Sequence, residues 1–316
     1  MKTLGDLIAG GWNSAINEVV CCNSLDGMKL IPDNSIDCCI TSPPYWALRD
    51  YGVKGQIGAE ESFAEYLENL WKIFDEVKRI LKKDGTCFVN LGDVYGGTSD
   101  KGNYRAPKNP KGRNGQSKAL NKKYQSKSLL QIPSRFSIGM TDRGWILRNT
   151  IIWHKPNAMP QSCLDRFSVD FEYIFSFVKS KKYYFEQSLE PSRNRNDLEY
   201  RHALRRKNAI NYKMKKPYLG NFPKSFRLDG MRNKRCVWSI PTKGFREAHF
   251  AVYPPDLIKT PILSGCKKGG IVFDPFMGSW TTARMAKDLC RDFIGFELNP
   301  EYCDIGEKRL RQQILL

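Results

Sequence analysis

Two short segments, near opposite ends of the 316-residue chain, carry the residue types that could do chemistry. The first is Thr41-Ser42-Pro43-Pro44-Tyr45-Trp46, which directly follows an apolar run. Adjacent prolines fix φ near about −65° and carry no N–H group, so their carbonyls are free acceptors held in a stiff loop. Together with the Ser42 hydroxyl and the flat Tyr45 ring, such acceptors suit an exocyclic amine on a base turned out of its helix. In isolation, a structural turn with a buried tyrosine would be the simpler interpretation.

The second segment is Asp274-Pro275-Phe276-Met277-Gly278-Ser279-Trp280-Thr281-Thr282. Its small residues allow a sharp turn that brings N–H groups to a ligand, and the N-terminus of a following helix favours an anionic group. Glu297 comes 23 residues after Asp274, at the end of the next predicted strand. A carboxylate there can accept hydrogen bonds from both hydroxyls of a ribose. The pattern indicates a cofactor that contains a nucleoside, with an ordinary βαβ unit as the alternative.

Alternating strands and helices surround both segments and must position them. Apolar runs predict strands over residues 18–22, 35–40, 86–91, 171–178, 270–274 and 293–297. Helical spacing of apolar residues predicts helices over residues 61–82, 255–264, 281–289 and 300–312. This alternation is typical of an α/β fold with a doubly wound, mostly parallel sheet. Ligands bind beyond the carboxyl ends of the strands in such sheets, so we expect the two segments to face each other there.

Positive charge is concentrated in two parts of the chain. Lys and Arg number 51 against 33 Asp and Glu, which gives a formal net charge of +18. Residues 101–128 contribute +9 and residues 181–235 contribute +11, so the remaining 233 residues sum to −2. A polyanion such as DNA is the natural partner, because Lys and Arg release counterions from phosphates. Solvated faces, RNA and an anionic membrane surface are the alternatives.

Composition also excludes several classes of protein. With 41% apolar and 12% aromatic residues, a wholly disordered chain is excluded. No stretch approaches 18 uninterrupted apolar residues, so we expect no membrane span, and the N-terminus lacks the long apolar region of a secretory signal. The ten cysteines form no C-x-x-C and the histidines number three, so reduced thiols in the cytoplasm and no metal site are expected.

The two segments together resemble a known family, the amino-directed DNA methyltransferases. These enzymes use S-adenosylmethionine to methylate N4 of cytosine or N6 of adenine. Ser42-Pro43-Pro44-Tyr45 is similar to the catalytic loop of that family, and the segment from Asp274 to Ser279 is similar to its cofactor loop. Their order, catalytic first and cofactor last, is similar to the circularly permuted beta class. The resemblance covers nearly the whole chain and implies a Rossmann-like methyltransferase fold.

The resemblance also assigns the cofactor site. It implies that the methionine end of S-adenosylmethionine lies against the cofactor loop, that Glu297 binds the ribose, and that Phe250 begins a covering helix. Asn23 takes the place where the family often has an Asp for the adenine amine. Trp280 stands where Gly is common, so either the turn does not need a positive φ or the indole lies across the cofactor entrance. The residues assigned to the cofactor are Asn23, Phe250, Asp274, Phe276, Gly278, Ser279 and Glu297.

For catalysis, the resemblance implies direct methyl transfer. Ser42 and the Pro43 carbonyl would accept the amine protons, and Tyr45 would stack on the extruded base. Ser at the head of the loop favours cytosine N4. Adenine N6 is the alternative, and an inactive DNA-binding homologue is a third. The same resemblance implies action on DNA in the cytoplasm of a bacterial cell, from a bacterial or phage gene, and leaves open a homodimer and a cognate restriction endonuclease.

The expected organisation has three parts. Residues 1–180 form the catalytic half, with a mobile basic loop over 98–128, and residues 237–316 form the cofactor-binding half. Between them, residues 181–236 are an inserted target-recognition region for double-stranded DNA. Its candidate DNA-binding residues are Arg201, Arg205, Arg206, Lys213, Lys215 and Lys216.

Overall fold

The computed structural model describes residues 1–48, 51–97, 123–191, 231–242 and 253–312. The chain forms two compact units. The larger consists of Met1–Glu186 and Cys236–Leu316, and the smaller of Gln187–Arg235. Among the described helices, none combines the length and apolar character that a bilayer crossing requires.

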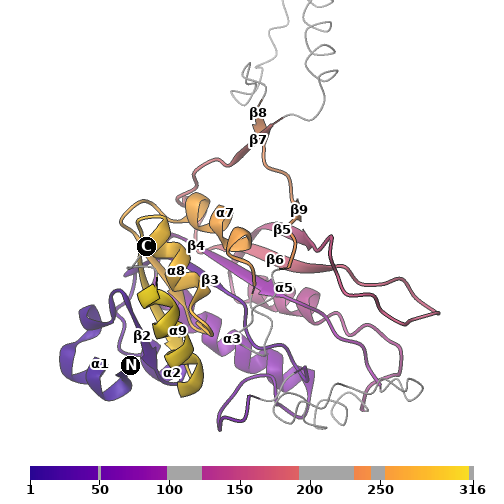
Figure 1. Ribbon diagram of the computed structural model, residues 1–316, viewed down its shortest axis with the longest axis horizontal. Coiled ribbons are helices and arrows are strands. Elements are labelled where there is room, and N and C mark those ends of the chain that lie inside the picture. Colours follow the sequence, from indigo (N-terminus) through magenta and orange to yellow (C-terminus); the bar gives the residue numbers. More distant parts are fainter. Residues whose placement is uncertain (49–50, 98–122, 192–230, 243–252, 313–316) are drawn as a thin grey trace, which may run out of the picture. The chain divides into compact units, whose positions relative to one another are not determined.

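The larger unit is built around a sheet of nine strands (Figure 1). The strand order is β1-β2-β11-β10-β3-β4-β6-β5-β9, and β6 alone runs antiparallel to its two neighbours. The strands are β1 Lys2–Thr3, β2 Glu18–Cys21, β3 Ile36–Thr41, β4 Leu81–Leu91, β5 Ile146–His154, β6 Phe171–Val178, β9 Val237–Ser239, β10 Ile271–Asp274 and β11 Asp292–Glu297. The predicted α/β fold with a mostly parallel sheet is confirmed.

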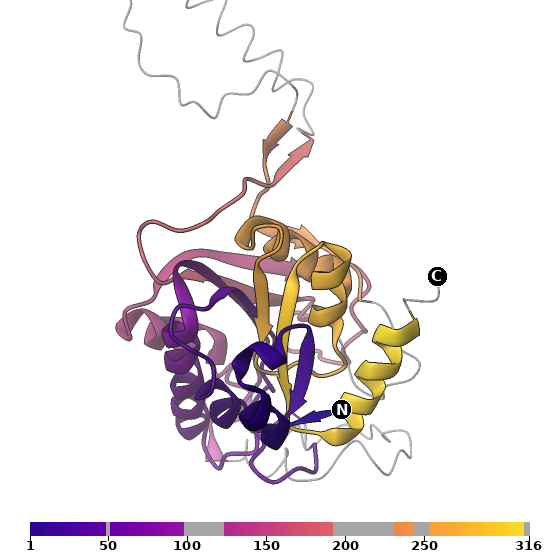
Figure 2. The ribbon, with the colours of Figure 1, turned by 90° about the vertical axis from the view of Figure 1, so that its left-hand side faces the viewer.

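Helices cover both faces of this sheet (Figure 2). One face packs against α1 Leu4–Gly10, α2 Ser24–Met28, α3 Phe63–Ile80 and α5 Ile132–Asp142, with the short 3₁₀ helix η1 Trp12–Ala15 beside them. The other face packs against α7 Pro255–Gly265, α8 Thr281–Asp288 and α9 Pro300–Gln312. Successive side chains of a strand point to opposite faces, so Cys38 and Cys39 lie in different core clusters. Burial on both faces explains why β3 is uniformly apolar except for Asp37 and Thr41.

The boundary between α3 and β4 differs from the prediction. The Ser62 side chain caps α3 by accepting a hydrogen bond from the Glu65 backbone N–H, and the helix ends at Ile80. β4 then begins at Leu81, although the sequence predicts a strand only from residue 86. The ladder with β3 pairs Ile36 with Leu81 and resumes at Cys38 and Thr86. The residues between these two pairs form an irregularity in the ladder. Because the strand is interrupted there by polar residues, no alternating or apolar run predicts that it begins at Leu81.

The smaller unit contains an antiparallel pair, β7 Leu189–Pro191 and β8 Met231–Asn233. Arg232 and Glu190 form an ion pair across it at 2.9 Å. The six Arg and Lys residues predicted to bind DNA come between β7 and β8 in the sequence, and they are outside the residues that the structure describes. Most of the predicted loop over 98–128 also lies outside them. The role in target recognition therefore stays a prediction.

Candidate active site

Two adjacent strands bring the distant segments together. β3 pairs with β10 in parallel, with Val272 opposite Cys38 and Phe273 opposite Cys39. The loops that follow these strands consequently leave the same edge of the sheet. Both line one cleft of about 960 Å³, to which the first loop contributes Ser42, Pro43, Pro44 and Tyr45. The second contributes Phe276, Gly278 and Ser279, and Asn23 and Glu297 complete the predicted residues that line it.

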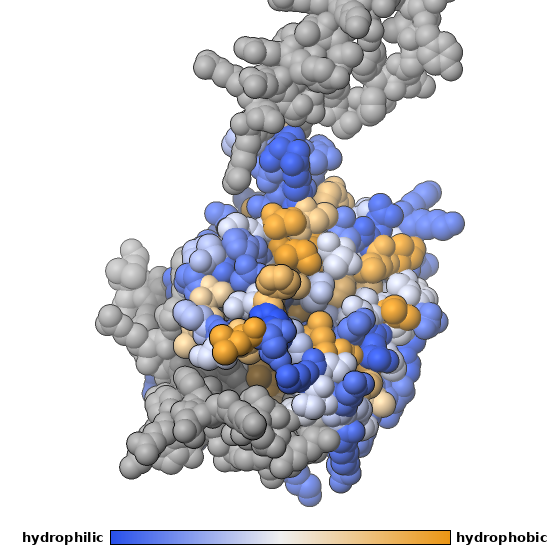
Figure 3. Space-filling view, turned by 90° about the vertical axis from the view of Figure 1, so that its right-hand side faces the viewer, coloured by the Kyte–Doolittle hydropathy of each residue, from blue (hydrophilic) through white to orange (hydrophobic). Residues whose placement is uncertain are grey.

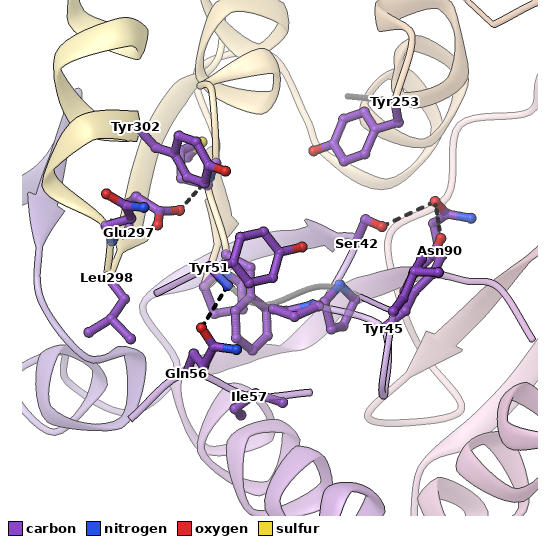
Figure 4. Close-up of a pocket in the computed structure, with 18 of the residues that line it drawn as sticks. Ser42, Tyr45, Tyr51, Gln56, Ile57, Asn90, Tyr253, Glu297, Leu298 and Tyr302 are labelled. Carbon is purple, nitrogen blue, oxygen red and sulfur yellow. Dashed lines mark hydrogen bonds between the residues drawn. The ribbon is translucent and has the colours of Figure 1, made fainter. Parts of the chain in front are cut away.

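On the catalytic side of the cleft, Asn90 at the end of β4 lies beside Ser42 and Tyr45 of the predicted loop (Figure 4). Its side-chain nitrogen connects them to β6. Ser42 Oγ lies 3.2 Å from Asn90 Oδ1, and Asn90 Nδ2 donates to Glu172 Oε2 at 3.1 Å and to the Tyr173 carbonyl at 3.0 Å. Since a carboxylate and a carbonyl only accept, the amide nitrogen must face them and the amide oxygen must face Ser42. The Ser42 hydroxyl therefore donates to Asn90.

The Tyr45 phenol belongs to the same network. Its hydroxyl lies 2.8 Å from Glu172 Oε2 and 3.2 Å from Asn90 Oδ1. The single phenolic proton goes to the charged and closer carboxylate. Burial, and then the charge of Glu172, raise the pKa of Tyr45 well above its ordinary value. Tyr45 thus stays protonated and fixed, with its ring close to the backbone of Gly92.

Glu172 is balanced by a cation. Lys155 Nζ forms an ion pair with Glu172 Oε1 and lies 4.5 Å from the centre of the Trp153 ring. All three residues line the cleft. Sequence reasoning did not identify Asn90, Glu172 or Lys155. The one signal was a charged residue, Glu172, within the largely apolar and aromatic segment 171–178.

On the other side of the cleft, Glu297 at the end of β11 accepts hydrogen bonds from the backbone N–H groups of Gly278 at 2.7 Å and Asn299 at 2.8 Å. Burial raises the pKa of Glu297 to about 7, and the nearby Asp274 carboxyl adds to the shift. Gly278 has a φ of 55°, which a glycine adopts without strain. The turn thereby aims its N–H at the carboxylate.

An aromatic wall stands beside Glu297. The rings of Tyr51 and Tyr302 meet edge to face with centroids 6.2 Å apart, and Ile57 and Leu298 line the same part of the cleft (Figure 4). Such a surface suits the flat face of a purine. No local pattern predicts this wall, because Tyr51 follows the catalytic loop and Tyr302 belongs to the distant helix α9.

Asp274 differs from the prediction that it lines the cofactor cleft. Its side chain is fully buried and is not part of the cleft surface. One carboxylate oxygen accepts from the Phe276 backbone N–H at 3.0 Å, and the other from Thr282 Oγ1 at 2.6 Å and the Tyr253 hydroxyl at 3.1 Å. These bonds satisfy the buried charge and fix the loop from behind. Asp274 therefore holds the shape of the cofactor loop but does not line the cleft.

Trp280 fits neither sequence alternative. It does adopt a left-handed conformation, with φ 65° and ψ 29°, at the N-cap of α8. Its indole is 5% exposed and is not part of the cleft surface. The ring instead lies against Gly306 of α9, so closely that an added Cβ would come within 2.2 Å of it. Burial of the indole offsets the strain of the turn, and the indole does not enter the cleft.

The two remaining cofactor predictions have different outcomes. Asn23 lines the cleft as the N-cap of α2, where its Oδ1 accepts from the Leu25 backbone N–H at 2.9 Å. A carbonyl oxygen has two lone pairs, so a second donor can still be accepted. Phe250 lies outside the described residues.

Known proteins match this architecture along nearly the whole chain. A family model described as DNA methylase (N6_N4_Mtase) matches residues 36–308. The type II methyltransferase M.Cfr9I of Citrobacter freundii is 39% identical over 291 residues, which span 92% of this chain and 86% of the relative. M.SmaI of Serratia marcescens is 35% identical over 306 residues, spanning 93% and 90%. The chain therefore belongs to the N6/N4 family of DNA methylases, and the resemblance inferred from the two loops is confirmed.

Solved structures agree at the level of the fold. PvuII DNA methyltransferase, described as cytosine-N4-specific, superposes with a TM-score of 0.61 at 19% identity, covering 92% of this chain and 85% of the other. The complex of M1.HpyAVI with SAM gives a TM-score of 0.51 at 17% identity, covering 92% and 96%.

Proposed function

We propose that this DNA methylase transfers a methyl group from S-adenosylmethionine to the exocyclic N4 of a cytosine turned out of double-stranded DNA. One observation carries the proposal: Ser42, its hydroxyl proton committed to Asn90, faces the cleft that Glu297 also lines. An oxygen whose proton is already donated can only accept from a group in the cleft. An exocyclic amine is such a donor, whereas a ring carbonyl is not.

The residues on the other side of the cleft fit the cofactor. Glu297 retains lone pairs for the two ribose hydroxyls, because each of its oxygens accepts one backbone N–H bond. Tyr51 and Tyr302 offer an aromatic surface to the adenine, and Asn23 can accept from its amine. The bound cofactor would supply a methyl group on a sulfonium, which is already strongly electrophilic. The protein would mainly orient and desolvate the reacting groups.

On the substrate side, the chain's own residues hold the amine. Ser42 Oγ and the Pro43 carbonyl accept its two protons, which directs the nitrogen lone pair toward the methyl group. Tyr45, locked by Glu172, offers its ring to the extruded base. The released proton cannot stay on Asn90, because a neutral amide is not a base at ordinary pH. The proton therefore leaves to the solvent at the mouth of the cleft, while Glu172 keeps Asn90 and Tyr45 in place.

Cytosine is preferred over adenine because a serine heads the catalytic loop. The fold neighbour described as cytosine-N4-specific supports this choice by analogy alone. Adenine N6 remains the second candidate, since its amine would meet the same acceptors. The complete network from Ser42 to Glu172 argues against the third candidate, an inactive DNA-binding homologue.

The decisive experiment identifies the methylated nucleoside. Unmodified double-stranded DNA is incubated with the protein and isotope-labelled S-adenosylmethionine, digested to nucleosides and analysed by mass spectrometry. We expect labelled N4-methylcytosine from the native protein, and far less from Ser42→Ala at an unchanged cofactor affinity. Labelled N6-methyladenine would show that adenine is the substrate base instead. The absence of any labelled nucleoside would overturn the proposal. Ile8→Ala, an exposed change on α1, is the matched control.

A further inference from the structure

The connection between β5 and β6, residues 155–170, exposes large apolar side chains. The exposed fractions are 81% for Met159, 103% for Leu164 and 97% for Phe167. Burying such side chains would stabilise the fold, yet all three, within nine positions, remain in contact with water. The connection projects beyond the sheet in Figure 1. Figure 3 views the molecule from that side, where apolar clusters stand among hydrophilic side chains.

The polar residues of this loop are held against the rest of the larger unit. At its base, the Lys155 backbone N–H donates to the Asp170 carbonyl at 2.7 Å. Asp165 pairs with Lys127 at 2.6 Å, and the Arg166 guanidinium lies 4.2 Å from the centre of the Tyr95 ring. Leu164 and Phe167 flank these anchored residues yet remain in water. These contacts place Leu164 and Phe167 beside Lys127 and Tyr95.

The position of the loop relates it to the active site. Ala158, Met159, Gln161 and Val169 line the same cleft as Ser42. The loop is therefore part of the rim through which a substrate must pass. Its anchors also connect it to positive charge, because Lys127 belongs to the segment 101–128 that contributes +9. A polyanion drawn to that charge would meet the apolar side chains next to the cleft.

We propose that Leu164 and Phe167 insert into the DNA base stack beside the target base and fill the space that this base leaves on entering the cleft. The inference rests on the proposed function, because only a nucleobase substrate in a duplex leaves such a space. Turning a base out of a helix costs stacking and pairing energy. Leucine and phenylalanine are among the side chains that proteins insert between base steps, where they replace lost stacking with apolar contact.

The test compares two duplexes that carry the methylation site, located first by mapping methylated plasmid DNA. One duplex is fully paired, and in the other the target base faces a mismatch, which lowers the cost of turning it out. The variants are Leu164→Ala, Phe167→Ala, their combination, and the conservative Phe167→Leu. We expect the double variant to lower kcat/KM at least about tenfold on the paired duplex and less than about threefold on the mismatched one. Phe167→Leu should keep most of the native rate, and Ile8→Ala all of it.

Each outcome has a distinct meaning. A native protein that methylates neither duplex would contradict the proposed function itself. With an active native protein, an unchanged double variant would overturn the insertion, and so would an equal loss on both duplexes. A change of oligomeric state without loss of rate would assign the surface to protein contact and overturn it as well. Affinity for S-adenosylhomocysteine verifies folding, and the single variants carry the test if the double variant fails to fold.

Discussion

The side-chain nitrogen of Asn90 donates to the Glu172 carboxylate at 3.1 Å, across the β4–β6 pair. Because the carboxylate can only accept, this bond orients the amide and makes its oxygen the acceptor for Ser42. The direction of every bond in the network thus follows from one partly buried carboxylate, whose side chain is 18% exposed. Glu172 acts through Asn90 and Tyr45, so we regard it as a positioning residue.

Glu172→Gln keeps the shape of the side chain but should no longer fix which atoms of Asn90 and Ser42 donate and which accept. Its amide can donate as well as accept, so Ser42 would no longer be held as an acceptor toward the cleft. We expect kcat to fall about 10–100-fold, or about 1.4 kcal/mol per factor of ten, while the cofactor Kd changes less than about twofold. Single-turnover methylation and calorimetry measure the two quantities. Glu18→Gln, at an exposed site on β2, is the control, and a loss confined to cofactor affinity would contradict the assignment.

Cofactor binding should depend on pH through Glu297. Its pKa of about 7 means that the carboxyl is partly protonated at neutral pH, and only the ionised form offers acceptors to both ribose hydroxyls. We expect the affinity for S-adenosylhomocysteine to rise between about pH 6 and pH 8, by up to about tenfold per unit below the pKa. Calorimetry in matched buffers measures it. Glu297→Gln should bind more weakly and show no such rise, and a parallel rise in the variant would assign the effect to another group.

The same pKa has a consequence for stability with the opposite sign. Folding raises the pKa of Glu297 above its ordinary value of 4.5. Between these values the folded protein holds a proton that the unfolded chain has released, so the free energy of unfolding contributed by this group falls as pH rises toward about 7. Denaturant unfolding should show this decline in the native protein without cofactor. Glu297→Gln should flatten it, and an unchanged slope in the variant would contradict the assigned pKa.

Gly306→Ala should destabilise the protein through Trp280. The added Cβ would lie 2.2 Å from the indole, so the ring or α9 must move, at a cost of about 1–3 kcal/mol. Trp280→Gly should also destabilise, because loss of a buried indole costs about 3–5 kcal/mol and the relieved left-handed backbone returns only about 1–2 kcal/mol. In the Trp280→Gly background, Gly306→Ala should cost nothing. Gly5→Ala, whose Cβ would find its nearest neighbour at 3.7 Å, is the helix control, and additive effects would exclude the contact.

DNA affinity should fall steeply with salt. The segments 101–128 and 181–235 together carry +20, and every phosphate that they neutralise releases a counterion. We expect log K to decline linearly with log salt, with a loss of about 10³-fold or more between 50 and 200 mM if six or more phosphates are contacted. Fluorescence anisotropy with a labelled duplex measures the slope. A flat dependence would show that these segments do not bind the backbone.

Local sequence patterns predicted most of the sheet and both loops of the site. The largely apolar β3 and β10 and the helical spacing in α3 are local signals. β11, β10 and β3 lie side by side in the sheet, which explains how Ser42 and Glu297 share a cleft. The prediction that the catalytic and cofactor loops lie close together rested on their resemblance to the family and on the rule that ligands bind beyond strand ends.

The network behind Ser42 could not be predicted in this way. Glu172 reaches it through the antiparallel register of β4 and β6, which pairs Asn90 with Ile174, and no local pattern fixes that register. Asp274 turned away from the cleft because Thr282 and Tyr253 offer hydroxyls from behind. The place of Trp280 depends on Gly306, in a different helix. In each case a deciding partner belongs to another element of the fold, which no local pattern predicts.

The pairing of β3 with β10 also matters while the protein is being synthesised. A ribosome releases β3 early, but the strand that covers one of its edges is translated more than two hundred residues later. Until then the nascent chain exposes an apolar strand with an unpaired edge, which favours aggregation or chaperone binding. A prematurely terminated product lacking residues 271–316 would keep this edge permanently open. We expect such fragments to be catalytically inactive and to be removed by proteolysis.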